Sequence, residues 1–144
     1  MESRYEALKL EKQLCFPLYA CSRSVIREYK PFLDQLDLTY TQYIAMLVLW
    51  EKGTMTVKEL GEQLYLDSGT LTPLLKKLEH KGLITRKRSS EDERNLILTL
   101  TKAGMNMREE ALSIPEQLAK TVPLEHDEAE TLYKLLYKIL EKQG

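Results

Sequence analysis

A short helix followed directly by a hairpin with a charged tip restricts the fold of this chain most. Between Leu64 and Leu100 the sequence reads LYLDSGTLTPLLKKLEHKGLITRKRSSEDERNLILTL. Leucines at i, i+3, i+4 and i+7 form one apolar helical stripe, and Gly82 supplies the backbone freedom that ends the helix. Two strand-like runs, 84–88 and 95–100, then bracket the polar turn SSEDER. The stripe consists of Leu71, Leu74, Leu75 and Leu78.

The start of this helix allows two interpretations. Asp67 is a good N-cap, but a helix from there to Lys81 places Pro73 in its second turn. A later start, with Thr72 as the cap and Pro73 first, satisfies local rules better but leaves 68–71 without regular structure. The earlier start is therefore preferred. Because a capping box at 56–59 opens another helix just before it, the region predicts a helix-turn-helix with a β-hairpin wing.

The rest of the chain is predicted to be helical. A first helix covers about 5–29, is interrupted by Pro17 and closes before Pro31, and a short turn or helix follows at 32–36. A capping box at 39–42 opens a helix over 43–50, which Gly53 ends. After the wing, Thr101 caps a helix to about 119, and a last helix covers about 125–142.

The terminal helices predict a homodimer. The fold class is mainly α: one winged-helix domain over 1–144, with the winged helix-turn-helix at about 39–100 and dimerisation helices at about 1–35 and 102–144. A small winged helix cannot cover a long amphipathic helix at each terminus, whereas a second copy can. Two-fold symmetry would place two recognition helices roughly 34 Å apart on one DNA face. We therefore expect an inverted-repeat DNA site.

Charge is distributed unevenly although the net charge is only −1. Between Lys76 and Arg94 there are seven basic and four acidic side chains, and the remainder has 14 basic and 18 acidic ones. A basic face on an acidic body orients a protein on a phosphate backbone. No apolar run approaches the roughly 20 residues of a membrane span. With only two cysteines, a reducing cytoplasm is the expected location.

The DNA contacts are expected to divide by chemistry. Short polar side chains at the helix start suit base edges, basic side chains suit phosphates, and an arginine at the wing tip, held by a carboxylate, suits an A·T-rich minor groove. The expected base-reading residues are Asp67, Ser68, Thr70 and Thr72. The expected phosphate contacts are Lys76, Lys77, Arg86 and Arg88, with Arg94 and its partner Asp92 at the tip.

These stretches resemble the MarR family of winged-helix repressors. The matching segments are LDSGTLTPLLKKLEHKGLITR and DERNLILTLT, the latter with the family's D-x-R…L-T signature at Asp92, Arg94, Leu98 and Thr99. The segment QLCFPLYA is similar to the branch that senses organic hydroperoxides (OhrR-type). Because no cysteine follows residue 21, the chain resembles the one-cysteine variety.

The resemblance implies a repressor that leaves DNA when Cys15 is oxidised. It also implies that tyrosines, some from the partner subunit, hydrogen-bond the thiol; Tyr19, Tyr29 and Tyr40 match those positions. The thiolate is the peroxide-reactive form, and hydroxyl donors favour it. Release is expected to need a second step, either a mixed disulfide with a low-molecular-weight thiol or a sulfinic acid. Cys21 is interpreted as structural, since six helical residues rise about 9 Å, beyond disulfide reach.

Other interpretations remain open. The same fold could respond to a small aromatic ligand, or act as a general thiol-redox regulator in which Cys15 is not specific for peroxide. A thiol peroxidase and a winged helix used only for protein contacts are rivals from other classes, and the basic wing argues against an enzyme. No cofactor or metal site is predicted, because His80 and His126 are isolated and no Gly-rich phosphate loop occurs.

Overall fold

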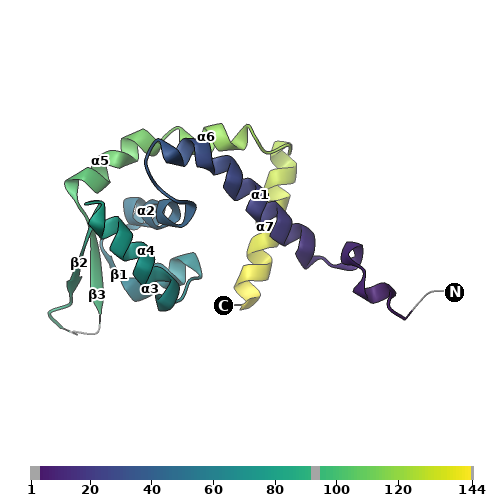
Figure 1. The fold of residues 1–144 in the computed structure, drawn as a ribbon, viewed down its shortest axis with the longest axis horizontal. Coiled ribbons are helices and arrows are strands. Elements are labelled where there is room, and N and C mark those ends of the chain that lie inside the picture. The colour runs from purple at the N-terminus through teal and green to yellow at the C-terminus, as the bar shows by residue number, and fades with distance from the viewer. Residues whose placement is uncertain (1–3, 92–94, 144) are drawn as a thin grey trace. The chain divides into compact units, whose positions relative to one another are not determined.

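The structure, a computed structural model, describes residues 4–91 and 95–143 and falls into two compact units (Figure 1). Met1–Ile114 contains nearly all the core, and Pro115–Gly144 contains the last helix. The division of 1–144 into one domain with a central winged helix stays a prediction. The helices are α1 (Cys15–Asp34), α2 (Tyr40–Lys52), α3 (Val57–Leu64), α4 (Ser68–His80), α5 (Lys102–Ala111), α6 (Ile114–Ala119) and α7 (His126–Gln143). The strands are β1 (Met55–Thr56), β2 (Ile84–Arg88) and β3 (Leu96–Leu100).

Side-chain caps determine where the central helices begin. The Thr39 hydroxyl accepts the Gln42 amide at 3.3 Å and Gln42 Oε1 accepts the Thr39 amide at 3.0 Å, which completes the predicted capping box. Asp67 Oδ1 accepts the Thr70 amide at 2.7 Å, so the preferred start of α4 is confirmed. The alternative start at Thr72 is wrong. Proline inside α4 withdraws only one backbone donor, and the buried leucine stripe compensates for it.

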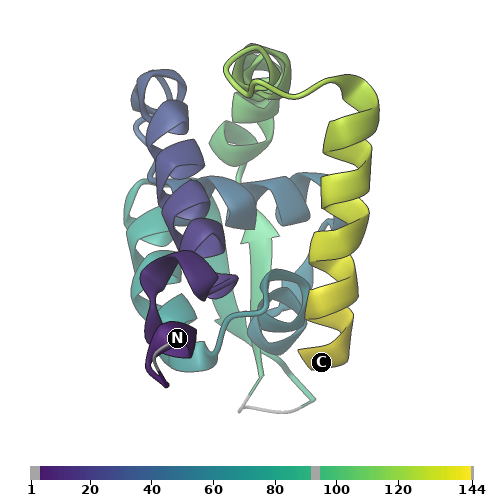
Figure 2. The same cartoon turned by 90° about the vertical axis from the view of Figure 1, so that its right-hand side faces the viewer.

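The wing is a hairpin in a three-stranded antiparallel sheet of order β1-β3-β2. Its register pairs Ile84 with Leu100, and Figure 2 shows the two long strands side by side. β1 adds a third strand through Met55, which pairs with Leu98. Sequence analysis missed β1 because two residues are too few for a visible alternation. Its edge pairing ties the start of α3 to the base of the wing.

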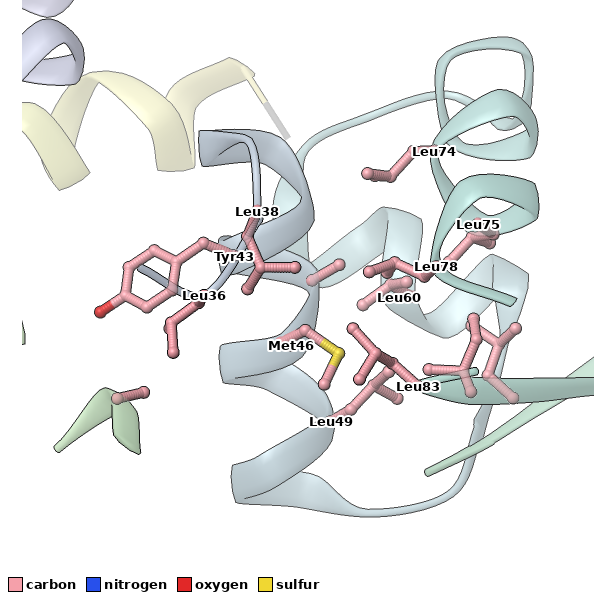
Figure 3. Close-up of a cluster of buried hydrophobic side chains, with 14 of the residues drawn as sticks. Leu36, Leu38, Tyr43, Met46, Leu49, Leu60, Leu74, Leu75, Leu78 and Leu83 are labelled. Atoms are coloured by element: carbon pink, nitrogen blue, oxygen red, sulfur yellow. The ribbon is translucent and has the colours of Figure 1, made fainter. Parts of the chain in front are cut away.

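The core gathers around α2. Figure 3 shows Met46 and Leu49 of this helix facing Leu60, Leu78 and Leu83. All four leucines of the α4 stripe are buried, as predicted. Tyr43 lies on the other side of α2, toward Leu36, with its hydroxyl pointing away from the leucine cluster (Figure 3). α2 therefore separates a leucine core beneath α4 from an aromatic cluster beside α1.

The predicted first helix, 5–29, was wrong at both ends. Two 3₁₀ turns, Glu6–Leu8 and Leu10–Lys12, precede α1, which begins at Cys15 and continues through Pro31 to Asp34. Pro17 is the third residue of α1, where no intrahelical donor is needed, so it interrupts nothing. Pro31 is exposed and withdraws a single bond near the helix end. The predicted short element at 32–36 is mostly the last turn of α1.

The helix predicted after the wing is divided. Thr101 caps α5 as predicted, accepting the Gly104 amide at 3.0 Å, but α5 ends at Ala111 and α6 begins at Ile114. Proline at position 115 cannot donate to a carbonyl of α5, which favours the break. α7 follows as a long helix close to the predicted 125–142. Over the described residues, none of the helices is long and apolar enough to cross a membrane.

Candidate nucleic-acid interface and thiol site

One face of α4 is polar and exposed along its length. Ser68, Thr72 and Lys76 recur every four residues along one side of the buried leucine stripe, and all three are exposed. Thr70 and Lys77 are exposed on the other side of the stripe. The Thr72 hydroxyl donates to the Ser68 carbonyl at 2.8 Å, which orients it along the helix. The fold thus leaves the predicted base-reading and phosphate-binding residues of α4 accessible, while their contacts with DNA stay predictions.

Asp67 has a structural role before any role in recognition. Its carboxylate caps α4, and the hydrogen bond from the Thr70 backbone amide lowers the pKa of Asp67 below its usual value. The side chain therefore stays ionised near neutral pH. Asp67 is exposed at the start of α4, and its contact with a base edge stays a prediction.

Arg86 joins the wing to α4. Its Nη2 and Nε lie 3.0 and 3.2 Å from Glu79 Oε1, and the pair lowers the pKa of Glu79. The Arg86 side chain is 19% exposed, so its guanidinium holds β2 against α4. From the sequence, Arg86 was predicted only as a phosphate contact. Its partner Glu79 was missed because a separation of seven residues between a helix and a strand gives no helical-pair signal. Arg88 is exposed on the same strand, whereas Asp92 and Arg94 lie outside the described residues.

Cys15 is the first residue of α1 and is exposed in the single chain. Cys21 is also exposed, about 1.7 turns further along α1. Gln13 precedes α1, and its side-chain amide donates to the Ala7 and Lys9 carbonyls.

Three tyrosines form an aromatic cluster where α1 meets α2. The ring centroid of Tyr29 lies 4.9 Å from that of Tyr40 and 5.6 Å from that of Tyr43. Burial, and then the neighbouring phenols, raise the pKa of Tyr29 to about 12, and burial also raises the pKa of Tyr40 and Tyr43. All three hydroxyls therefore remain protonated donors at physiological pH. Sequence analysis missed Tyr43, although its position three residues after Tyr40 was a usable signal.

The predicted shell of the thiol does not assemble within one chain. Tyr19 is exposed beneath the Arg23 guanidinium, 5.5 Å from its ring centroid. Tyr29 lies fourteen residues after Cys15 in the same helix, a rise of about 21 Å. This distance separates the tyrosine cluster from the thiol of its own chain.

We expect the tyrosine cluster to make stability fall at high pH. Because the folded pKa of Tyr29 exceeds the unfolded value of 10.0, its contribution is complete below pH 10 and is lost as pH rises toward 12. The measurement is the urea unfolding free energy of the parent and of Tyr29→Phe at pH 9 and pH 11. The parent should lose more stability over this range than the phenylalanine variant. Equal losses would contradict the raised pKa.

The winged-helix fold and the exposed polar side of α4 define a DNA-binding transcriptional regulator. A family model for the transcriptional regulators SarA/Rot matches residues 27–111. The chain is also 52% identical to the organic hydroperoxide resistance transcriptional regulator of Bacillus subtilis (strain 168) over 141 residues, 98% of this chain and 96% of that protein. The chain belongs to the SarA/Rot family of transcriptional regulators.

Solved structures agree with this assignment. Reduced AbfR bound to DNA has a TM-score of 0.81 and 35% identity, over 98% of this chain and 99% of that one. Overoxidized AbfR bound to DNA has a TM-score of 0.78 and 36% identity, over 99% of this chain and 100% of that one. The predicted resemblance to MarR-type, organic-hydroperoxide regulators and the predicted winged-helix fold are confirmed.

Proposed function

We propose that this regulator binds an A·T-rich inverted repeat as a homodimer and leaves it when an organic hydroperoxide oxidises Cys15. The observation that carries the proposal is the match, over nearly the whole chain, to a regulator of organic hydroperoxide resistance. The exposed thiol at the start of α1 supports it, because a sensor needs access to its oxidant. The reaction is placed in the cytoplasm, where DNA and low-molecular-weight thiols are both present.

The chemistry needs one thiol and two external reactants. The Cys15 thiolate attacks the outer oxygen of the hydroperoxide, the O–O bond breaks, and an alcohol leaves after protonation of the alkoxide. Sulfur is oxidised to the sulfenic acid while the peroxide is reduced. A low-molecular-weight thiol then attacks the sulfenic sulfur and releases water, which leaves a mixed disulfide. The protein is a reactant in this sequence and turns over no substrate.

A second copy of the chain completes the proposed site. Tyr29 lies about 21 Å along α1 from the thiol of its own chain, and Tyr40 of α2 packs against Tyr29, so only a partner can bring them to Cys15. α1 exposes an apolar face that includes Phe16 and Ile26, and α7 exposes Leu135 and Ile139. Faces of this kind are covered in an obligate dimer.

Bulk at Cys15 is proposed to cause the release. Sequence analysis allowed either a sulfinic acid or a mixed disulfide as the second step. A related regulator in its overoxidized form is described as bound to DNA, which favours the mixed disulfide for this chain. Inserting a thiol adduct into a packed dimer site costs about 1–3 kcal/mol for overpacking alone.

The direct test is a binding assay on DNA from the gene's own upstream region. We expect nanomolar-range retention of the duplex by the reduced protein, on the order of typical specific binding, and loss after cumene hydroperoxide with a low-molecular-weight thiol. A parallel binding assay uses an aromatic acid in place of the peroxide. Release of DNA by the aromatic acid but not by the peroxide would identify the protein as a ligand-responsive regulator.

Lys77→Ala should weaken binding on every sequence. The side chain is exposed on α4, and a phosphate contact contributes affinity without sequence information. We expect a similar loss of affinity on upstream and random duplexes. The slope of log affinity against log salt concentration should become shallower by about one. Fluorescence anisotropy over a salt series measures both. A changed base preference would assign Lys77 to base reading instead.

A further inference from the structure

Lys81 joins the end of α4 to the corner between α1 and α2. Its Nζ donates to the Asp37 backbone carbonyl and, at 3.1 Å, to Gln42 Oε1, and lies 3.7 Å from Asp37 Oδ2. Lys81 is also the C-cap residue of α4, and its amide donates to the Lys77 carbonyl. One ammonium group thus bonds the end of α4 to Asp37 in the connection between α1 and α2 and to Gln42 in the first turn of α2.

Gln42 makes this bond hard to replace with water. Its side chain is buried, with 2% of the residue exposed. The oxygen that accepts from Lys81 also accepts from the Thr39 amide and so completes the capping box of α2. Loss of Lys81 removes a charged donor from a buried oxygen, and such a change is costly. The start of α2 and the end of α4 therefore share one acceptor atom.

The backbone conformation of Asp37, in the connection between α1 and α2, is also held by Lys81. The residue adopts a left-handed backbone with φ of 55°, where α1 ends and the Leu38 amide turns back to the Leu33 carbonyl at 3.1 Å. This conformation is unfavourable for a residue with a side chain and persists where its surroundings hold it. The bond from Lys81 to the Asp37 carbonyl is one such constraint.

The tyrosine cluster lies on the same corner. Tyr29 belongs to α1, and Tyr40 and Tyr43 flank Gln42 in the first turns of α2. On the far side of Lys81, the bond between Arg86 and Glu79 fixes the wing to α4. The tyrosine cluster, Gln42, Lys81 and the Arg86–Glu79 pair thus follow one another from α1 to the wing.

We propose that Lys81 and Gln42 are positioning residues that transmit displacement of the tyrosine cluster to α4 and the wing, and so set DNA affinity. The proposal rests on the proposed function for the sensing role of the tyrosines. The link itself requires no peroxide. Its signature is that damage to the cluster lowers DNA affinity only while the Lys81 bond is intact.

A double-mutant cycle tests the link in the Cys15→Ser background, where peroxide chemistry is removed. Tyr29→Leu keeps apolar volume but removes the ring contacts, and Lys81→Met keeps the alkyl stem but removes the donor. With Lys81 present, we expect Tyr29→Leu to weaken binding to the upstream duplex about tenfold; in the methionine variant, the loss should be under about twofold. Lys30→Met, which removes an exposed ion pair with Asp34 on α1, should leave the tenfold loss intact.

Amide hydrogen exchange gives a readout that does not need DNA. The amides of Lys81 and Leu83, at the end of α4, should exchange faster in Tyr29→Leu and in Lys81→Met, with no further increase in the double variant. Additive effects in both binding and exchange would overturn the link. A parent protein that ignores hydroperoxide while the cycle remains non-additive would refute the proposed sensing function and retain the link.

Discussion

Cys15→Ser is expected to bind the upstream duplex like the parent protein and to ignore organic hydroperoxide. Serine preserves the size and polarity of the residue at the start of α1 but lacks the sulfur that accepts an oxygen atom. The parent should lose about a hundredfold in affinity, which corresponds to about 2.7 kcal/mol between the two states. Fluorescence anisotropy before and after treatment with hydroperoxide and a low-molecular-weight thiol measures both proteins.

Cys21→Ser is the matched control for this substitution. Both cysteines are exposed in the same helix, so general thiol reactivity alone would affect both. Only Cys15 lies at the start of α1, in the segment whose resemblance implies the sensing thiol. We expect Cys21→Ser to respond like the parent. Release that requires Cys21 and not Cys15 would overturn the mechanism, whereas release in neither variant would mean that both thiols take part.

The central fold was predictable because its signals are local. The caps at Thr39 and Asp67 each satisfy a backbone amide within three residues, and such pairs are visible in the sequence. The α4 leucine stripe and the two strands of the hairpin follow from periodicity. The terminal helices were harder, because whether Pro17 and Pro31 interrupt a helix depends on where that helix begins and on what packs against it.

The candidate sites were predictable only in part, since their contacts join distant segments. Lys81 reaches Asp37 and Gln42 across about forty residues, and no spacing rule relates them. Arg86 was interpreted as a phosphate contact because its bond to Glu79 depends on how β2 packs on α4. Tyr29 and Tyr40 matched a known family, but their contact with each other, and their distance from Cys15, required the helices in place.

Gly104→Ala should destabilise the protein by about 3 kcal/mol, the upper part of the usual range for overpacking. A Cβ at this position of α5 would lie 2.1 Å from the Leu83 carbonyl oxygen. That oxygen is fixed, because it accepts the Thr101 amide at 3.0 Å. The Gly104 carbonyl in turn accepts Trp50 Nε1 at 2.8 Å, so moving α5 away also breaks a bond to α2.

Gly69→Ala is the control for Gly104→Ala, since both glycines lie in the first turn of a helix. A Cβ at position 69 meets only Asp67 Oδ1, at 3.6 Å, an ordinary contact. Because alanine loses less entropy than glycine in a helix, this variant should gain about 0.5–1 kcal/mol. Urea denaturation at one protein concentration measures both, as stability of a dimer depends on concentration. Opposite signs are therefore expected from the same substitution. Equal stability of Gly104→Ala and the parent would mean that α5 does not need its close approach to the base of the wing.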